Sequence, residues 1–390
     1  MGQRFYTDYN IGLNKEYTAG FIRPRIGAKT LSFKLDDTYM NQAVETSHSY
    51  VTPQASLDTG LYFERELFRL DENYTQTLEP RIFYLWRDYE DQSDLTQLYS
   101  GGEAVNFDSS LLSPSYQQLF RDSRFSGGDR LDDTHQVTIG LASRFIENAS
   151  GIERLRVGVG QIIYFKDRDV HLNYWDPVVG DQIAEDKLST AQKRARDEYR
   201  RNRDTTSMLA GYIGGQIGDY FTFSNDITID PQDAKVQSLS TTLRYMDDEY
   251  RIVNVGYRYS LDRQASAPID GERPYSNSDL NQIDISTIWP VNDQWAAIAR
   301  INYDINYDAY LDTFVGMEYD DCCYRVRVMA RRWVDYDLSG NMLEELSGRD
   351  YDRGIFLELQ LKGIGTISRK IGRLLDKAVY GYSEREESLQ

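Results

Sequence analysis

Residues 310–334, YLDTFVGMEYDDCCYRVRVMARRWV, carry two alternating patterns of apolar and polar residues, separated by two aspartates and the chain's only two cysteines. In the second pattern one face carries Arg325, Arg327 and Arg331, and the opposite face carries Tyr324, Val326, Val328 and Ala330. A period of two is that of a β-strand, whose successive side chains point to opposite faces. The stretch therefore predicts two long strands joined by a tight turn.

The same alternation recurs along most of the chain. It is found in residues 53–63, 78–86, 137–145, 155–165, 251–261, 281–291, 295–305 and 355–361. Most of these runs have 9 to 11 residues, more than the five or six that are usual in soluble sheets, and they suit a tilted crossing of a bilayer. Tyr, Trp and Phe gather near the ends of the runs, where an interfacial aromatic girdle would lie.

The connections between the runs are of two kinds. Long polar segments occur at residues 88–133, 166–204, 262–279 and 336–351, and short turns occur at 147–151, 218–219, 247–249, 292–293 and 320–321. If the chain crosses a sheet up and down, the long segments fall on one side and the short turns on the other, as in outer-membrane barrels. We count about 15 strands, with the first beginning on the outer side. The odd number predicts that further strands precede this chain.

Composition is compatible with this reading. The 390 residues have a formal charge of −18 and a mean hydropathy of −0.60. The acidic balance argues against a nucleic-acid binder. The sequence contains no run of 18 apolar residues, so it predicts no membrane-spanning helix. A β-barrel needs no such run, because its strands place only alternate residues in lipid. The predicted fold class is all-β: an antiparallel up-and-down transmembrane β-barrel with a short C-terminal helix.

Charged residues within the strands predict which face meets lipid. An arginine that faces lipid at mid-bilayer costs roughly 2–4 kcal/mol, so the charged face should line the lumen. The residues expected to point inward are Glu79, Arg81, Arg258, Arg325, Arg327, Arg331 and Glu358, and those expected outward are Leu57, Leu61, Ile82, Tyr84, Val253, Val255, Leu357 and Leu359. The inward charges are either a simple polar lining or contacts for a plug protein or an anionic ligand.

Two segments outside the strands show helical spacing. Residues 366–380 place apolar residues on one stripe, with Thr366 as a candidate N-cap, and predict a short helix on the periplasmic rim. The alternative is an independent membrane anchor, for which a stripe of about four turns is short. Residues 187–203 are basic and are a second candidate, in an outer loop. The expected division is a barrel portion, residues 1–362, and a periplasmic tail, residues 363–390.

The histidines of the chain form no catalytic or metal-binding pattern. His48, His135 and His171 are far apart and lack the spacing of metal ligands or of a catalytic triad. We therefore expect no enzyme activity, no catalytic residue, no metal and no cofactor.

The cysteines of the short turn, Cys322 and Cys323, are adjacent in the chain. Their Cα atoms are about 3.8 Å apart, and an unstrained disulfide usually needs more than about 4.4 Å. The sequence has no third cysteine, so oxidised partners would lie in another chain or in sequence that this chain lacks. The alternative is a pair of inert thiols at a strand end.

Several blocks of sequence identify a family resemblance. They are YTQTLEPR (74–81), Tyr84-Leu85, DQS (91–93), FDS (107–109), LFRD (119–122), FSG (125–127), DRL (129–131), VGQ (159–161), YDDCCYRVRV (319–328), FLELQLKG (356–363) and Gly381-Tyr382. Together they resemble the barrel of the LPS-assembly protein LptD, the organic solvent tolerance family, from about residue 50 onward. The TLEPR block and the Cys-Cys turn occur in the family's order, which makes the resemblance specific.

The resemblance implies a barrel of about 26 strands in the outer membrane of a Gram-negative bacterium. It implies an N-terminal periplasmic jellyroll that receives lipopolysaccharide from an LptA-like bridge, and an LptE-like lipoprotein that plugs the lumen. It further implies disulfides from Cys322 and Cys323 to that N-terminal domain. The jellyroll and its cysteines are absent here, so the chain resembles the C-terminal part of such a protein.

The resemblance also implies that lipopolysaccharide leaves through a seam between the first and last strands. The seam strand in this chain is Gly354, Ile355, Phe356, Leu357, Glu358, Leu359, Gln360 and Leu361. We expect it to pair antiparallel with residues 324–334 and to find no partner for its other edge, in particular not residues 4–11. The alternatives are a large porin or substrate-specific transporter, an outer-membrane enzyme, and a soluble β-rich adhesin.

Overall fold

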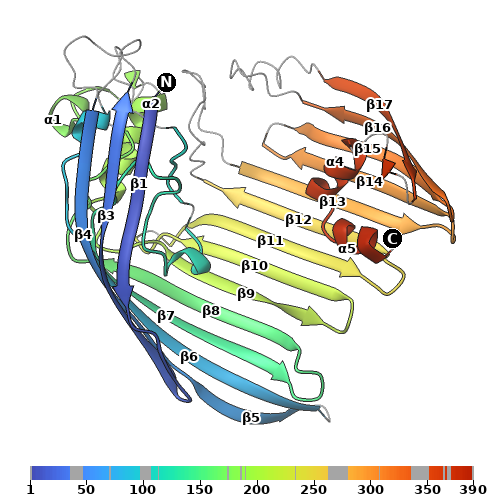
Figure 1. The fold of residues 1–390 in the computed structure, drawn as a ribbon, viewed down its shortest axis with the longest axis horizontal. Helices are drawn as coiled ribbons and strands as arrows, with labels where there is room; N and C mark the ends of the chain where they lie inside the picture. Colours follow the sequence, from blue (N-terminus) through green and yellow to red (C-terminus); the bar gives the residue numbers. More distant parts are fainter. Residues whose placement is uncertain are drawn as a thin grey trace.

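The computed structural model describes residues 2–35, 47–69, 72–96, 107–112, 114–173, 175–184, 187–188, 190–232, 234–261, 280–306, 308–334, 351–362, 365–366 and 370–388. These residues form one antiparallel sheet that curves around a concave side (Figure 1). The strands are β1 (Gly2–Gly12), β2 (Lys15–Tyr17), β3 (Gly20–Leu35), β4 (Ser47–Leu61), β5 (Phe63–Arg69), β6 (Glu72–Arg87), β7 (Thr134–Glu147), β8 (Glu153–Tyr164), β9 (Leu209–Ile217), β10 (Phe221–Ile229), β11 (Val236–Met246), β12 (Ile252–Ser260), β13 (Leu280–Pro290), β14 (Trp295–Asp304), β15 (Ala309–Asp320), β16 (Tyr324–Trp333), β17 (Asp352–Leu361) and β18 (Gly365–Thr366). The helices are α1 (Pro177–Gly180), α2 (Thr190–Arg201), α4 (Lys370–Ala378) and α5 (Tyr382–Ser388), with short 3-10 turns η2 (Ser93–Thr96) and η3 (Tyr116–Gln118).

The sheet is built in chain order. β2 continues β1 along β3, β5 continues β4 along β6, and β18 adds only two residues to β17. From β6 to β17 every strand pairs antiparallel with the next. The described part of the chain therefore crosses the sheet fifteen times, as the alternation predicted.

The long and short connections lie at opposite ends of the strands. The connection from β6 to β7 and the one from β8 to β9, which holds α1 and α2, share one end with the start of β1 (Figure 1). The turn with Cys322 and Cys323 joins β15 to β16 at the other end. The predicted topology is confirmed for these connections; residues 262–279 and most of 336–351 lie outside the described residues.

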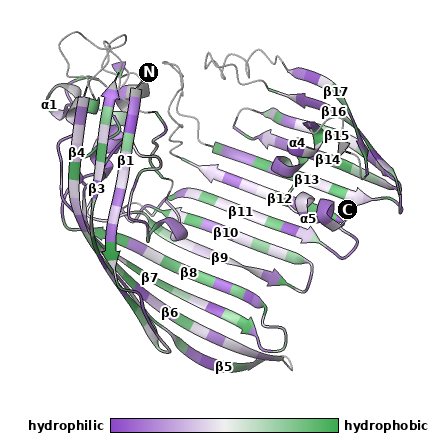
Figure 2. Ribbon diagram, viewed as in Figure 1, coloured by the Kyte–Doolittle hydropathy of each residue, from purple (hydrophilic) through white to green (hydrophobic). Residues whose placement is uncertain are grey.

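The sheet has the reverse of the burial pattern of a soluble protein. Ile11, Ile355 and Leu357 on the convex face are 79, 82 and 67% exposed, whereas Arg325 and Arg327 on the concave face are each 2% exposed. Figure 2 shows hydrophobic and hydrophilic residues alternating along the strands. A sheet face that exposes this many apolar side chains is stable in lipid and would aggregate in water.

The outward predictions agree with the register. Leu57 lies opposite Tyr84, and Leu57, Leu61, Ile82 and Leu357 are among the exposed apolar residues. Val253 and Val255 lie one and three positions from buried Ile252 and thus on the other face, and Leu359 lies opposite Val326. Among the described residues, no helix has the length and apolarity that crossing a membrane requires.

The C-terminal helices pack on the concave side (Figure 1). Ile371, Leu375, Val379 and Tyr382 form one core with residues of β12 to β16, namely Ile252, Ile288, Ala296, Ile298, Phe314 and Met329. The predicted apolar stripe is therefore the buried face of α4. The predicted N-cap is wrong, because Thr366 pairs with Gln360 as part of β18. The sequence did not predict α5.

Candidate functional site: the concave face and the edge strand

Arg327 is the centre of a buried ion network on the concave face. Its register partners are Glu318 on β15 and Glu358 on β17. Arg327 Nε lies 2.6 Å from Glu318 Oε2, and Nη1 lies 2.8 Å from Glu358 Oε1. The two carboxylates are 1% and 3% exposed. Charges removed from water this completely are tolerated only when each has a partner, and the strand register supplies one.

Helix α5 completes the network from the concave side. Arg385 Nη2 donates to Glu318 Oε1 at 2.7 Å, and Glu386 accepts from Arg325 Nη1 at 2.9 Å and from Arg327 Nη2 at 2.5 Å. Arg325 also donates to Asp320 at 2.7 Å. The network therefore joins β15, β16 and β17 to the C-terminal segment.

The other residues expected inward lie on the same face of their strands. Arg331 donates to Asp312 at 2.8 Å, and Asp312 also accepts from Arg300. Arg81 donates to Asp58 at 2.8 Å, and its guanidinium lies 4.1 Å from the ring centroid of Phe120, which belongs to a long connection. Glu79 accepts from Thr77, and exposed Arg258 lies on β12 in the same alternation as Ile252.

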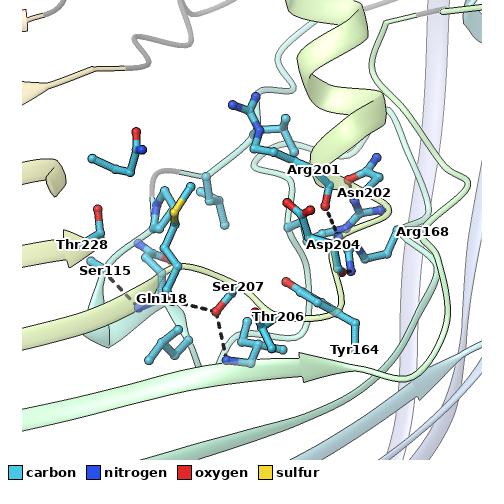
Figure 3. Close-up of a pocket in the computed structure, with 18 of the residues that line it drawn as sticks. Ser115, Gln118, Tyr164, Arg168, Arg201, Asn202, Asp204, Thr206, Ser207 and Thr228 are labelled. Atoms are coloured by element: carbon cyan, nitrogen blue, oxygen red, sulfur yellow. Dashed lines mark hydrogen bonds between the residues drawn. The ribbon is translucent and has the colours of Figure 1, made fainter. Parts of the chain in front are cut away.

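Sequence reasoning missed a cavity at the end of the sheet that carries the long connections (Figure 3). Its volume is about 230 Å³ and its lining is mostly apolar, with Leu119 and Ile162 among the lining residues. Arg168 also lines it: Nη1 donates to Asp204 O at 3.0 Å, and its guanidinium lies 3.6 Å from the ring centroid of Tyr164. Acidic and basic side chains are both present in the lining, so its charge does not select one ligand.

The two long connections hold each other beside this cavity. Arg124 donates to Asp132 at 2.8 Å, and Asp133 accepts from the backbone N–H groups of Asp169 and Val170 at 2.8 and 3.0 Å. Burial raises the pKa of Asp133. Burial also lowers the pKa of His171 to about 4. The ionisable groups here are positioned by tertiary packing that no local pattern encodes.

The described residues contain no group of three or more His, Cys, Asp or Glu that could hold a metal ion. His48 stacks on Tyr50, His135 contacts the hydroxyl of Tyr84, and His171 accepts from Asn202. The three histidines are separate packing residues.

The last long strand, β17, has one fully paired edge and one that is almost free. All ten of its residues pair with β16, which confirms the predicted antiparallel pair. Among the residues that the structure describes, its other edge pairs only at Gln360 and Leu361, with β18. The prediction that this edge finds no partner is wrong at those two positions. Within the described residues β1 pairs only with β3, so β17 does not close on it.

The cysteine turn is exposed. Cys322 and Cys323 are free thiols whose sulfur atoms lie 2.8 Å apart. The hydrogen bond with Cys323 raises the pKa of the Cys322 thiol. Their predicted disulfides to another domain remain a prediction.

Comparison with known proteins gives a family match. Residues 1–295 match the family model for LptD, LPS transport system D. The LPS-assembly proteins LptD of Saccharophagus degradans and Pseudomonas fluorescens are each 36% identical, over 99% and 98% of this chain. The chain spans 41% and 38% of the length of these relatives.

Solved structures give weaker likenesses. The ferric enterobactin receptor of Pseudomonas aeruginosa is 10% identical, with a TM-score of 0.36 over 92% of this chain and 54% of that one. The siderophore receptor PirA of Acinetobacter baumannii is 8% identical, with a TM-score of 0.35 over 92% of this chain and 55% of that one.

Proposed function

Because the chain belongs to the LptD family, LPS transport system D, we propose that it forms part of an outer-membrane translocon that inserts lipopolysaccharide into the outer leaflet. The observation that carries the proposal is the combination of an exposed apolar convex face, a charged concave face and a nearly free edge on β17. Lipopolysaccharide needs a polar passage for its anionic sugars beside an opening to lipid for its acyl chains.

In this proposal the concave face is the lumen and β17 is one side of the seam. The lumen charges are Glu79, Arg81, Arg258, Arg325, Arg327, Arg331 and Glu358, and the seam residues are those from Gly354 to Leu361. An open sheet edge in hydrocarbon leaves backbone groups without partners, so the edge is covered by another strand except while substrate passes. Transport of this kind requires no covalent chemistry, and we assign no enzymatic activity, metal or cofactor.

The family match supports the partners and the compartment that we propose. We assign a lipoprotein plug of the LptE type to the lumen and an LptA-like periplasmic bridge to the delivery of substrate. Residues 1–362 are the barrel portion and residues 363–390 a C-terminal tail on the periplasmic side. Cys322 and Cys323 lie in the oxidising periplasm in this orientation, where disulfides to an N-terminal domain persist.

Depletion of the full-length protein in its host tests this function. Lipopolysaccharide at the cell surface, measured by a reagent that cannot cross the outer membrane, should fall while newly made lipopolysaccharide accumulates inside. The alternative, a large porin or substrate-specific transporter, predicts unchanged surface lipopolysaccharide and a loss of solute uptake. That second outcome would overturn the proposal.

A further inference from the structure

We propose that residues 370–388, which form α4 and α5 and are called the C-terminal brace below, hold β17 against β16 from the concave side, with Glu358 as the positioning residue. Opening at β17 is thereby confined to its other edge. The inference rests on the proposed function, because only a strand at a seam needs one edge that opens and one that does not.

Glu358 joins three elements with one carboxylate. It lies on β17, and its Oε1 accepts from Arg327 Nη1 of β16 at 2.8 Å. Its Oε2 accepts from the backbone N–H groups of Ile371 and Gly372 at 3.0 and 3.2 Å. These N–H groups belong to the first turn of the nine-residue helix α4, where they have no partner within the helix and where the helix dipole favours a negative charge.

The opposite end of the brace meets the neighbouring strands. Arg385 and Glu386 of α5 pair with Glu318 on β15 and with Arg325 and Arg327 on β16. The sign of the charge alternates from Glu318 on β15 to Arg327 on β16 and Glu358 on β17, and α5 adds one cation and one anion that each face an opposite charge. Displacing the brace would leave Glu318 and Glu358 each with one partner fewer in a water-poor site.

The apolar face of the brace is attached to a wide part of the sheet. Ile371, Leu375 and Val379 are at most 2% exposed and pack on residues of β12 to β16. From β17 only Phe356 joins this core, and it is partly buried. The brace is therefore fixed to the interior strands by apolar packing, and Glu358 gives it a polar contact with β17.

The two edges of β17 differ in the way this arrangement requires. Ten residues pair with β16, and two pair with β18. Ile355 and Leu357, on the convex face, are 82% and 67% exposed. A purely stabilising C-terminal segment would protect all the strands it covers alike, whereas a brace acting through Glu358 protects β17 selectively.

Hydrogen exchange of the full-length protein in detergent or lipid discriminates these roles. In E358Q, amides of β17 should exchange at least tenfold faster, while those of β7, which β8, β9 and β10 separate from the strands under the brace, stay unchanged. D284N is the matched control, because Asp284 pairs with Arg300 between neighbouring strands without contacting the brace. Equal exchange of β17 in E358Q and in wild type would overturn the proposal.

R385Q provides a second variant if E358Q fails to fold. Arg385 is on α5 and outside the sheet, so its replacement loosens the brace without altering any strand residue. The same selective loss of protection in β17 is expected, and uniform loss across β12 to β17 would overturn the proposal.

Rescue tests the link to transport. Val328 and Leu357 lie directly opposite each other on the convex face, so V328C/L357C can lock β16 to β17 covalently. E358Q should slow the appearance of lipopolysaccharide at the surface, and the oxidised lock should restore it. If the lock restores nothing while β17 exchange is fast, the brace does not act through this strand pair. If exchange behaves as expected but depletion leaves surface lipopolysaccharide unchanged, the proposed function fails and the brace stands.

Discussion

Arg327 on β16 and Glu358 on β17 lie directly opposite each other in the sheet, with Nη1 and Oε1 2.8 Å apart and both side chains shielded from water. Glu358 belongs to β17, whose other edge pairs at two of its described residues, so the contact with Arg327 helps to hold this strand on its fully paired side. A buried pair of this kind adds little net stability, but the loss of one partner leaves the other charge buried without compensation.

Removing Arg327 should therefore be costly. R327Q leaves Glu318 and Glu358 without their shared cation, and uncompensated buried charge typically costs about 3–5 kcal/mol. The free energy of unfolding in lipid vesicles, measured by urea titration, checks this. R81Q is the matched control, because Arg81 has a side chain 35% exposed beside Asp58 and should cost about 1 kcal/mol or less. Equal losses in the two variants would contradict the account.

The connection between β8 and β9 should lose local stability at acid pH, because His171 becomes protonated. Its folded pKa is about 4, against 6.5 for the free side chain, because burial and the nearby Arg124, Arg203 and Arg168 disfavour the cation. Protonation thus favours the opened state: local stability is complete above pH 6.5, declines as the pH falls towards 4, and changes no further below that.

The expected loss is at most about 3 kcal/mol, which hydrogen exchange of residues 166–208, corrected for the intrinsic pH dependence, can measure. H171F keeps a ring that can stack on Tyr199, as the imidazole does, but cannot titrate. Its exchange should depend much less on pH than that of the wild type between pH 7 and 4.5. A wild type as insensitive as H171F would refute this role for His171.

A charged side chain introduced on the convex face should impair folding into a membrane. Ile139 is 49% exposed near the middle of β7, and arginine on a lipid-facing position costs roughly 2–4 kcal/mol at mid-bilayer. I139R should therefore fold into vesicles much less completely than I139A, which loses only apolar area. If the two variants fold equally well, this face does not meet lipid.

The cysteine turn should be blocked in the full-length protein. Exposed thiols react readily with a maleimide, so Cys322 and Cys323 should be labelled only after reduction if both are bonded to another domain. Labelling of intact protein before and after a reductant, with C322S/C323S as the blank, measures this. Full labelling without reductant would show that the pair is free.

Much of the fold follows from the sequence because a strand's two-residue period is imposed by the backbone. Counting along residues 310–361 placed Arg327 and Glu358 on one face and in one ladder. The partners from α5 were not foreseen, because a seven-residue helix carries too few turns to give a periodic signal. Thr366 was assigned as an N-cap on its residue type alone, while pairing with Gln360 decides its conformation. The cavity beside Arg168 depends on contacts between connections far apart in the chain.

Photo-crosslinking at the edge of β17 in living cells tests the central claim most directly. A photoreactive residue at Ile355, which is 82% exposed beside the nearly free edge, should form adducts with lipopolysaccharide. The same residue at Val315, 62% exposed on the convex face of the interior strand β15, is the control for ordinary contact with membrane lipid. The account predicts a clear excess of lipopolysaccharide adduct at Ile355 over Val315. Equal yields at the two positions, or none at Ile355, would contradict the assignment of β17 as the side of a lipopolysaccharide exit.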